Sequence, residues 1–120
     1  MIYELNNKLY FVIMNNIKEY ISIIGAGSFG CAMALVLAKS SPNRNILLWA
    51  RREEVANEIN QSRNNKQYLP KNSKEFPVNI TAITNINTAI SKSKIIFIAI
   101  PGEYIIETLK GVNLNHKTIV

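Results

Sequence analysis

A glycine-rich turn, G-A-G-S-F-G, joins an apolar segment to a helix-forming segment. The apolar run Tyr20–Ile24 precedes the turn, and an alanine- and leucine-rich run follows it as far as Ala38. Gly25 permits a tight turn from strand to helix, Gly27 lets the backbone approach a pyrophosphate, and Gly30 lets the helix pack close to the strand. In this strand–turn–helix context the glycine pattern predicts a dinucleotide-binding site.

The helix expected to begin near Ser28 would direct its unpaired N–H groups and the positive end of its dipole toward phosphates. The alternative is a glycine-rich turn that only joins a buried strand to a buried helix. Cys31 lies in the first turn of this helix, where a small buried side chain is expected. We interpret Cys31 as a packing residue and not as a reactive thiol.

Strands and helices are expected to alternate along the rest of the chain. The segment 94–100 is apolar after its first residue, Lys94, which predicts a strand buried on both faces. The polar segment 62–79 is long for a structureless connection, and such loops are often functional. The alternation predicts an α/β fold, a doubly wound parallel sheet of the Rossmann type. Further strands are expected at 45–50, 78–83, 94–100 and 117–120, and further helices at 53–61 and from Pro101 to 111. Between them, Thr84 or Asn85 is expected to cap a helix that runs to about residue 91.

The end of the second expected strand carries Arg51 and Arg52 where an NAD site places an acidic side chain. Two guanidinium groups suit a 2′-phosphate, so the sequence predicts NADPH in preference to NADH, with NADH still possible. The alternative is that both arginines pair with Glu53 and Glu54 on a solvated face. Trp49 is expected in the core or in the wall of an adenine pocket.

Composition narrows the classes of partner. The formal net charge is +6, but the basic residues are scattered, and no aromatic residues interleave with them to form a base-stacking platform. A positive field also attracts an anionic cofactor and a phosphorylated small-molecule substrate, and we expect these as partners instead of nucleic acid. His116, the only histidine, is expected to be exposed to solvent, and no metal-ligand cluster or catalytic residue is assigned.

The sequence also indicates how the N-terminal part is organised and in which compartment the protein is expected. Residues 1–19 precede the first expected strand as an extension, and residues 20–120 form one dinucleotide-binding domain. The extension is open to three interpretations: an extra edge strand, a mobile arm, or residues upstream of a true start at Met14. Its apolar run 9–14 is too short to span a membrane, and no targeting segment is visible. With a single cysteine, which excludes an internal disulfide, we expect a cytoplasmic protein without a membrane partner.

Four segments resemble the NAD(P)-dependent glycerol-3-phosphate dehydrogenases in their order and spacing. They are Ile24–Gly30, Leu48–Arg52, Asn65–Pro70 and Ile98–Pro101. The first and last occur in several dehydrogenase families, whereas the Tyr-Leu-Pro sequence of the third is more particular. The resemblance covers residues 20–120 and implies reduction of dihydroxyacetone phosphate to sn-glycerol 3-phosphate by hydride transfer, for phospholipid synthesis.

Position by position, the resemblance implies that the backbone at Ser28 and Phe29 contacts the pyrophosphate. Phe29 stands where the bacterial enzymes usually have tryptophan, a departure that preserves an aromatic wall. Tyr68 would line the cofactor cleft from the long loop. Tyr104 matches an aromatic position near the nicotinamide half, and the alternative for it is a tyrosine on a helix surface.

The resemblance also implies that Arg51 and Arg52 hold the adenosine 2′-phosphate. In this family the fifth strand leads into a Lys-Gly turn, and a second, helical domain supplies another lysine and the groups that hold the glycerol phosphate. Val120 falls short of these, so we expect a domain truncated after its fifth strand and inactive by itself. Two alternatives stay open: a stand-alone nucleotide-binding module or decayed gene product, and a related enzyme such as a ketopantoate reductase or a UDP-sugar dehydrogenase. The Tyr-Leu-Pro sequence argues against the related enzymes.

Overall fold

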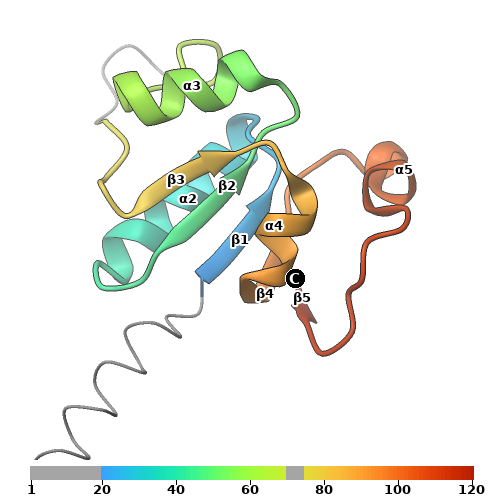
Figure 1. The fold of residues 1–120 in the computed structure, drawn as a ribbon. Helices are drawn as coiled ribbons and strands as arrows, with labels where there is room; N and C mark the ends of the chain where they lie inside the picture. Colours follow the sequence, from blue (N-terminus) through green and yellow to red (C-terminus); the bar gives the residue numbers. More distant parts are fainter. Residues whose placement is uncertain (1–19, 70–74) are drawn as a thin grey trace, which may run out of the picture.

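The computed structural model describes residues 20–69 and 75–120, so the interpretations offered for residues 1–19 and the position of Pro70 lie outside the described residues. Five parallel strands form one sheet in the order β3-β2-β1-β4-β5 (Figure 1). This order confirms the predicted doubly wound sheet of the Rossmann type. The strands are β1 (Tyr20–Ile24), β2 (Ile46–Trp49), β3 (Ile80–Ile83), β4 (Ser93–Ile98) and β5 (Thr118–Ile119).

Helices cover both faces of the sheet (Figure 1). Helices α2 and α3 share a buried core with one face, to which Ile23 and Leu48 contribute. Helix α4 packs with Ile24 and Ile96 on the opposite face. The crossover through α2 leads from β1 to β2, and the crossover through α4 leads from β3 to β4 on the opposite face. The two crossovers thus reach opposite sides of β1, which opens a crevice at the carboxyl end of β1. The helices are α2 (Ser28–Ser40), α3 (Glu53–Ser62), α4 (Ile86–Ser91), the 3-10 helix η1 (Gly102–Tyr104) and α5 (Ile105–Leu109).

Ser22 is a buried polar residue in the middle of the central strand β1. Its hydroxyl donates to the carbonyl oxygen of Ala89 in α4 at 2.7 Å, and it lies 2.6 Å from the Ser93 hydroxyl in β4. A buried hydroxyl is tolerated only when it is hydrogen-bonded, so these contacts fix α4 and β4 against β1. The predicted helix cap is confirmed nearby, because the Asn85 side chain accepts the N–H of Thr88 at 3.1 Å.

The third strand begins at Ile80, two residues later than predicted. The guanidinium of Arg63 donates to the carbonyl oxygens of Pro77 and Ile80, and the N–H of Ile80 bonds back to Pro77. These bonds close a turn that leaves Val78 95% exposed. An apolar β-branched residue therefore lies in a turn because long-range contacts override its local preference.

The expectation for the segment 94–100 is wrong in two respects. Strand β4 ends at Ile98, and only Ser93 and Ile96 within it are buried, whereas Phe97 and Ile98 are half-buried. The neighbouring strand β5 is only two residues long, so β4 is covered less completely than a strand inside a long sheet. An apolar run predicts a strand but not how much of each face is covered.

The helix expected from Pro101 to 111 is shorter and divided. Pro101 stands before the 3-10 helix η1, α5 follows, and the chain leaves helical geometry at Lys110 with φ −60° and ψ 126°. Gly111 then adopts a positive φ of 75°, which favours glycine and explains the end of the helix. His116 is exposed, as predicted.

Candidate cofactor-binding site

A cleft of about 970 Å³ lies at the carboxyl ends of β1, β2 and β4. This is the switch point of a doubly wound sheet, where such folds bind ligands. Seven of the nine residues singled out from the sequence line the cleft, and Gly30 and Arg52 do not. The lining residues are Gly25, Ala26, Gly27, Ser28, Phe29, Trp49, Arg51, Tyr68, Ile98, Ala99, Ile100, Pro101, Tyr104, Glu107 and Thr108.

Two glycines of the turn are required by close packing. Gly25 has a φ of +128°, and a Cβ there would lie 2.5 Å from the carbonyl oxygen of Ala99. A Cβ at Gly30 would lie 1.8 Å from the carbonyl oxygen of Gly25. Gly30 thus lets α2 approach the end of β1, which is the packing role predicted for it.

Gly27 differs from the other two, because nothing lies within 4 Å of a Cβ built on it. It occupies the N-cap position of α2, where no side chain caps the helix and no acidic residue stands in the first turn. The N–H groups that begin a helix lack partners within the helix, and the helix dipole favours an anion there. The open space at Gly27 and the uncapped start of α2 fit a phosphate group of a dinucleotide.

Besides Trp49, three exposed aromatic side chains line the cleft. Phe29 follows the glycine turn and is 62% exposed, Tyr68 comes from the segment after α3 and is 40% exposed, and Tyr104 ends η1 and is 51% exposed. Large aromatic rings offer flat apolar surface for planar ligand groups. The structure therefore brings together residues that are up to 75 positions apart in the sequence, Phe29 and Tyr104.

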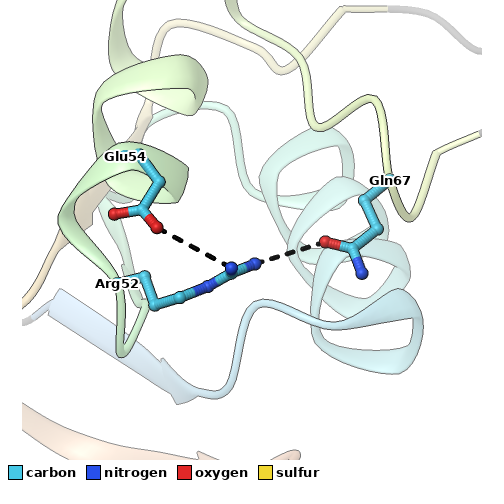
Figure 2. A network of polar contacts seen from close by, with 3 residues as sticks. All are labelled: Arg52, Glu54 and Gln67. Atoms are coloured by element: carbon cyan, nitrogen blue, oxygen red, sulfur yellow. Dashed lines mark hydrogen bonds and ion pairs between the residues drawn. The ribbon is translucent and has the colours of Figure 1, made fainter.

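The two arginines after β2 are placed differently. Arg51 lines the cleft. Arg52 turns toward α3 and the 64–69 segment, where its Nη2 donates to Oε1 of Gln67 at 3.3 Å and its Nη1 lies 3.7 Å from Oε1 of Glu54 (Figure 2). The pairing considered as the alternative for both arginines thus occurs for Arg52, with Glu54.

Trp49 is both a core residue and a wall of the cleft. Its side chain is 8% exposed, and its Nε1–H donates to the carbonyl oxygen of Thr84 at 2.8 Å. Glu107 and Thr108, on α5, also line the cleft and were not singled out from the sequence. Their positions three and four residues after Tyr104 place them on the same helical face, which is the sequence signal that could have found them.

Asn65 is the other site residue that sequence reasoning missed, since it entered only as part of a family segment. Its side chain is 1% exposed, and its Nδ2 donates to the carbonyl oxygen of Ala26 at 3.0 Å. Sγ of Cys31 lies 3.4 Å from the same oxygen. Burial raises the pKa of the Cys31 thiol to about 11, and the hydrogen bond from Asn65 opposes this in part. Cys31 is thus a buried neutral thiol, in agreement with the packing interpretation.

Residues 20–69 and 75–120 contain neither a cluster of metal-binding side chains nor a helix that could cross a membrane. This part of the chain holds no group of three or more His, Cys, Asp or Glu side chains arranged to bind a metal ion. None of its helices has the length and apolar character needed to cross a bilayer.

Known proteins similar to this chain are nicotinamide-dependent dehydrogenases. Residues 20–120 match the family model described as the NAD-dependent glycerol-3-phosphate dehydrogenase N-terminus. Glycerol-3-phosphate dehydrogenase [NAD(P)+] of Alcanivorax borkumensis is 39% identical over 97 residues, which are 81% of this chain and 27% of that protein. The same-named protein of Bacillus licheniformis is 39% identical over 89 residues, 74% of this chain and 25% of the relative. The chain therefore spans about a quarter of the length of these relatives.

The solved structure of glycerol-3-phosphate dehydrogenase from Coxiella burnetii superposes with a TM-score of 0.72 at 28% identity, covering 86% of this chain and 31% of that one. The matched family and the curated relatives are both named for a nicotinamide dinucleotide. The sequence match, the strand order and the cleft at the glycine turn all fit a dinucleotide-binding domain. The chain belongs to the family of NAD-dependent glycerol-3-phosphate dehydrogenases, and it corresponds to their N-terminal domain.

Proposed function

We propose that this chain binds NADPH, and NADH less tightly, as the cofactor-binding part of a glycerol-3-phosphate dehydrogenase. The observation that carries the proposal is the open position at Gly27 beneath the uncapped start of α2. A phosphate placed there would meet N–H donors and the positive end of the helix dipole without displacing any side chain.

Different residues of the cleft would contact different parts of the dinucleotide. The backbone of Ser28 and Phe29 would contact the pyrophosphate, and Trp49 and Tyr68 would wall the cleft. Tyr104, on the other side, would lie beside the nicotinamide half. When bound, the nicotinamide dinucleotide supplies the hydride in the interconversion of dihydroxyacetone phosphate and sn-glycerol 3-phosphate. The partner is then an anionic phosphorylated small molecule, and the setting is phospholipid synthesis in the cytoplasm, without nucleic acid or membrane as partners.

The preference for NADPH rests chiefly on Arg51. This side chain lines the cleft at the end of β2, where the adenosine ribose of a dinucleotide lies in such folds. Arg52 is held by Glu54, but both side chains are at least half exposed, and exposed ion pairs of this kind contribute little free energy. A 2′-phosphate could therefore recruit Arg52 at small cost, which makes Arg51 the first contact and Arg52 the second.

The test is calorimetric titration of the purified chain with NADPH and with NADH. Loss of a charge-assisted hydrogen bond predicts that Arg51→Ala weakens NADPH binding by about 10- to 100-fold and NADH binding by less than about threefold. Arg52→Ala should have a smaller effect in the same direction. Arg44→Ala is the matched control, because this exposed arginine lies in the loop before β2, away from the cleft lining.

Two outcomes would contradict the proposal. Absence of binding to either dinucleotide would mean that the cleft does not hold the cofactor. Equal affinities for NADPH and NADH, unaffected by Arg51→Ala, would remove the role of the arginines while leaving dinucleotide binding intact.

A further inference from the structure

Asn65 is a buried polar residue in the segment that carries Tyr68, and the cofactor contacts proposed above give it no role. Its side chain is 1% exposed. Its Nδ2 donates to the carbonyl oxygen of Ala26 at 3.0 Å and lies 3.5 Å from Sγ of Cys31. A buried amide costs free energy unless it is hydrogen-bonded, so this contact is a specific link between the 64–69 segment and the glycine turn.

The link fixes the peptide that joins Ala26 to Gly27. This peptide is trans, so its C=O and its N–H point in opposite directions. The Ala26 carbonyl points at the buried Asn65 side chain, and the N–H of Gly27 therefore points away from that side chain. Gly27 itself lines the cleft. A Cβ built on Gly27 would meet nothing within 4 Å, so no side chain fills the space beside this residue.

The main chain of Asn65 fixes a second wall of the same cleft. Its carbonyl oxygen accepts the N–H of Tyr68 at 3.2 Å and the N–H of Leu69 at 2.8 Å. Leu69 is buried in the core, and Tyr68 stands on the cleft. Asn65 thus holds the glycine turn through its side chain and the segment that carries Tyr68 through its main chain.

We propose that Asn65 is a positioning residue for the pyrophosphate, holding the Ala26–Gly27 peptide so that the N–H groups at the start of α2 face the cleft before the cofactor arrives. The inference rests on the proposed function. Donors fixed in the bound orientation raise affinity because ordering them costs nothing at the moment of binding. The amide is needed because its NH2 donates, whereas a carboxylate of the same shape only accepts and would repel the Ala26 carbonyl.

The first test compares Asn65→Ala and Asn65→Asp with the wild-type chain by calorimetry. The ligands are NADPH and adenosine 2′-monophosphate, which shares the 2′-phosphate but lacks the pyrophosphate. We expect NADPH binding to weaken by about 10- to 100-fold, more for Asp than for Ala, because the charge-assisted bonds to the pyrophosphate are misaligned. Binding of adenosine 2′-monophosphate should stay within about twofold, because the glycine turn of such folds binds the pyrophosphate, which this ligand lacks, and its 2′-phosphate would bind at the arginines instead.

Asn79→Ala is the matched control. The Nδ2 of Asn79 also donates to carbonyl oxygens around α2, those of Ala38, Ser41 and Arg44, but at the other end of the helix. This variant should lower the thermal midpoint and leave both affinities unchanged. Equal weakening of both ligands in Asn65→Ala, or no weakening of NADPH, would overturn the positioning role.

A second measurement needs no variant. In the ¹⁵N-labelled wild-type chain, the Asn65 side-chain protons should exchange slowly with solvent, and inorganic pyrophosphate should shift the Gly27 amide resonance. Gly102, whose Cβ position is also open and which does not line the cleft, provides the reference resonance. Fast exchange of the Asn65 side-chain protons would overturn the inference even if Asn65→Ala did not fold.

Binding measurements on the wild-type chain and on Asn65→Ala distinguish a wrong positioning role from a wrong cofactor site. A wild-type chain that binds neither NADPH nor pyrophosphate would contradict both. A wild-type chain whose NADPH affinity survives in Asn65→Ala would contradict the positioning role alone.

Discussion

The two ends of helix α2 differ in their polar partners. Near its C-terminal end, the Asn79 side chain bonds to three carbonyl oxygens, whereas no side chain caps the N–H groups at its N-terminal end. At the C-terminal end, Nδ2 of Asn79 donates to Ala38, Ser41 and Arg44 at 3.1, 3.3 and 2.9 Å. At the N-terminal end, Asn65 bonds to the preceding turn and leaves the first N–H groups of the helix free of its side chain.

The difference shows how one helix can be both anchored and functional. Unpaired groups at a helix end are stabilised by side chains, water or a ligand. The protein supplies side-chain partners at the C-terminal end, where Asn79 comes just before β3, and orients the N-terminal end toward the cleft. Breaking either arrangement should therefore affect different properties: stability at one end and anion binding at the other.

The largest effect is expected from Gly30→Ala, which breaks the close approach of α2 to β1. A Cβ at this position would lie 1.8 Å from the carbonyl oxygen of Gly25. Because this oxygen belongs to the backbone, it cannot move aside as a flexible side chain could, and α2 would have to shift away from β1. Chemical denaturation should show a loss of about 3 kcal/mol or more in the free energy of unfolding. Gly102→Ala, where the Cβ meets nothing, should change stability far less. A stable Gly30→Ala variant would contradict the packing described here.

Gly27→Ala should separate folding from binding at the N-terminal end. The added methyl group meets no protein atom, so stability should fall by less than about 1 kcal/mol, the loss expected for a poorer N-cap residue. The methyl group would stand where a phosphate approaches the backbone, and calorimetry should show NADPH binding weakened by about 100-fold. Unchanged binding in a folded variant would place the phosphate elsewhere.

The buried thiol of Cys31 makes the N-terminal end of α2 sensitive to alkaline pH. Burial raises its pKa from 9.0 to about 11, so between these values the folded chain keeps a proton that the unfolded chain has lost. The free energy of unfolding is therefore unaffected below pH 9 and falls as the pH rises, by about 2 kcal/mol at pH 11.

Denaturation curves at pH 8 to 11 should show this loss in the wild-type chain and a shallower pH dependence in Cys31→Ala. The comparison isolates the contribution of the thiol, because the two proteins share every other ionisable group. Parallel pH dependences for the two proteins would show that the thiol is not buried as described.

The smallest effect is expected from Asn79→Ala at the C-terminal end. Three carbonyl oxygens lose a shared donor, of which that of Arg44 is exposed and can bond to water instead, whereas Ala38 is buried, so the expected loss is about 1 kcal/mol. Thermal unfolding measures that loss, and hydrogen exchange should show faster opening of the last turn of α2. A loss of NADPH affinity in this variant would erase the distinction between the two ends.

Much of the fold was predictable because its signals are local. Each apolar run is bounded by turn residues, and the alternation with helical segments predicts a parallel sheet. The glycine turn predicted both the packing role of Gly30 and the open position at Gly27, since each depends on the absence of a side chain. The family resemblance added Tyr68 and Tyr104, and both line the cleft.

The errors occurred where burial or pairing depends on distant partners. Val78 has strand-forming chemistry, yet Arg63 holds the neighbouring Pro77 and Ile80 in a turn. Phe97 looks like a fully buried core residue, yet beside a strand of only two residues it is only partly buried. Local preference is worth too little free energy to decide against several long-range contacts.

The sequence by itself determined the order of the elements, the glycine turn and the class of ligand, because these depend on residue type and on spacing along the chain. Only the tertiary structure decided that Arg51 faces the cleft while Arg52 pairs with Glu54 and Gln67, and that Asn65 reaches the carbonyl of Ala26, 39 positions away. A side chain chooses among partners by distance and direction, and these quantities exist only once the strands are paired and the helices are packed.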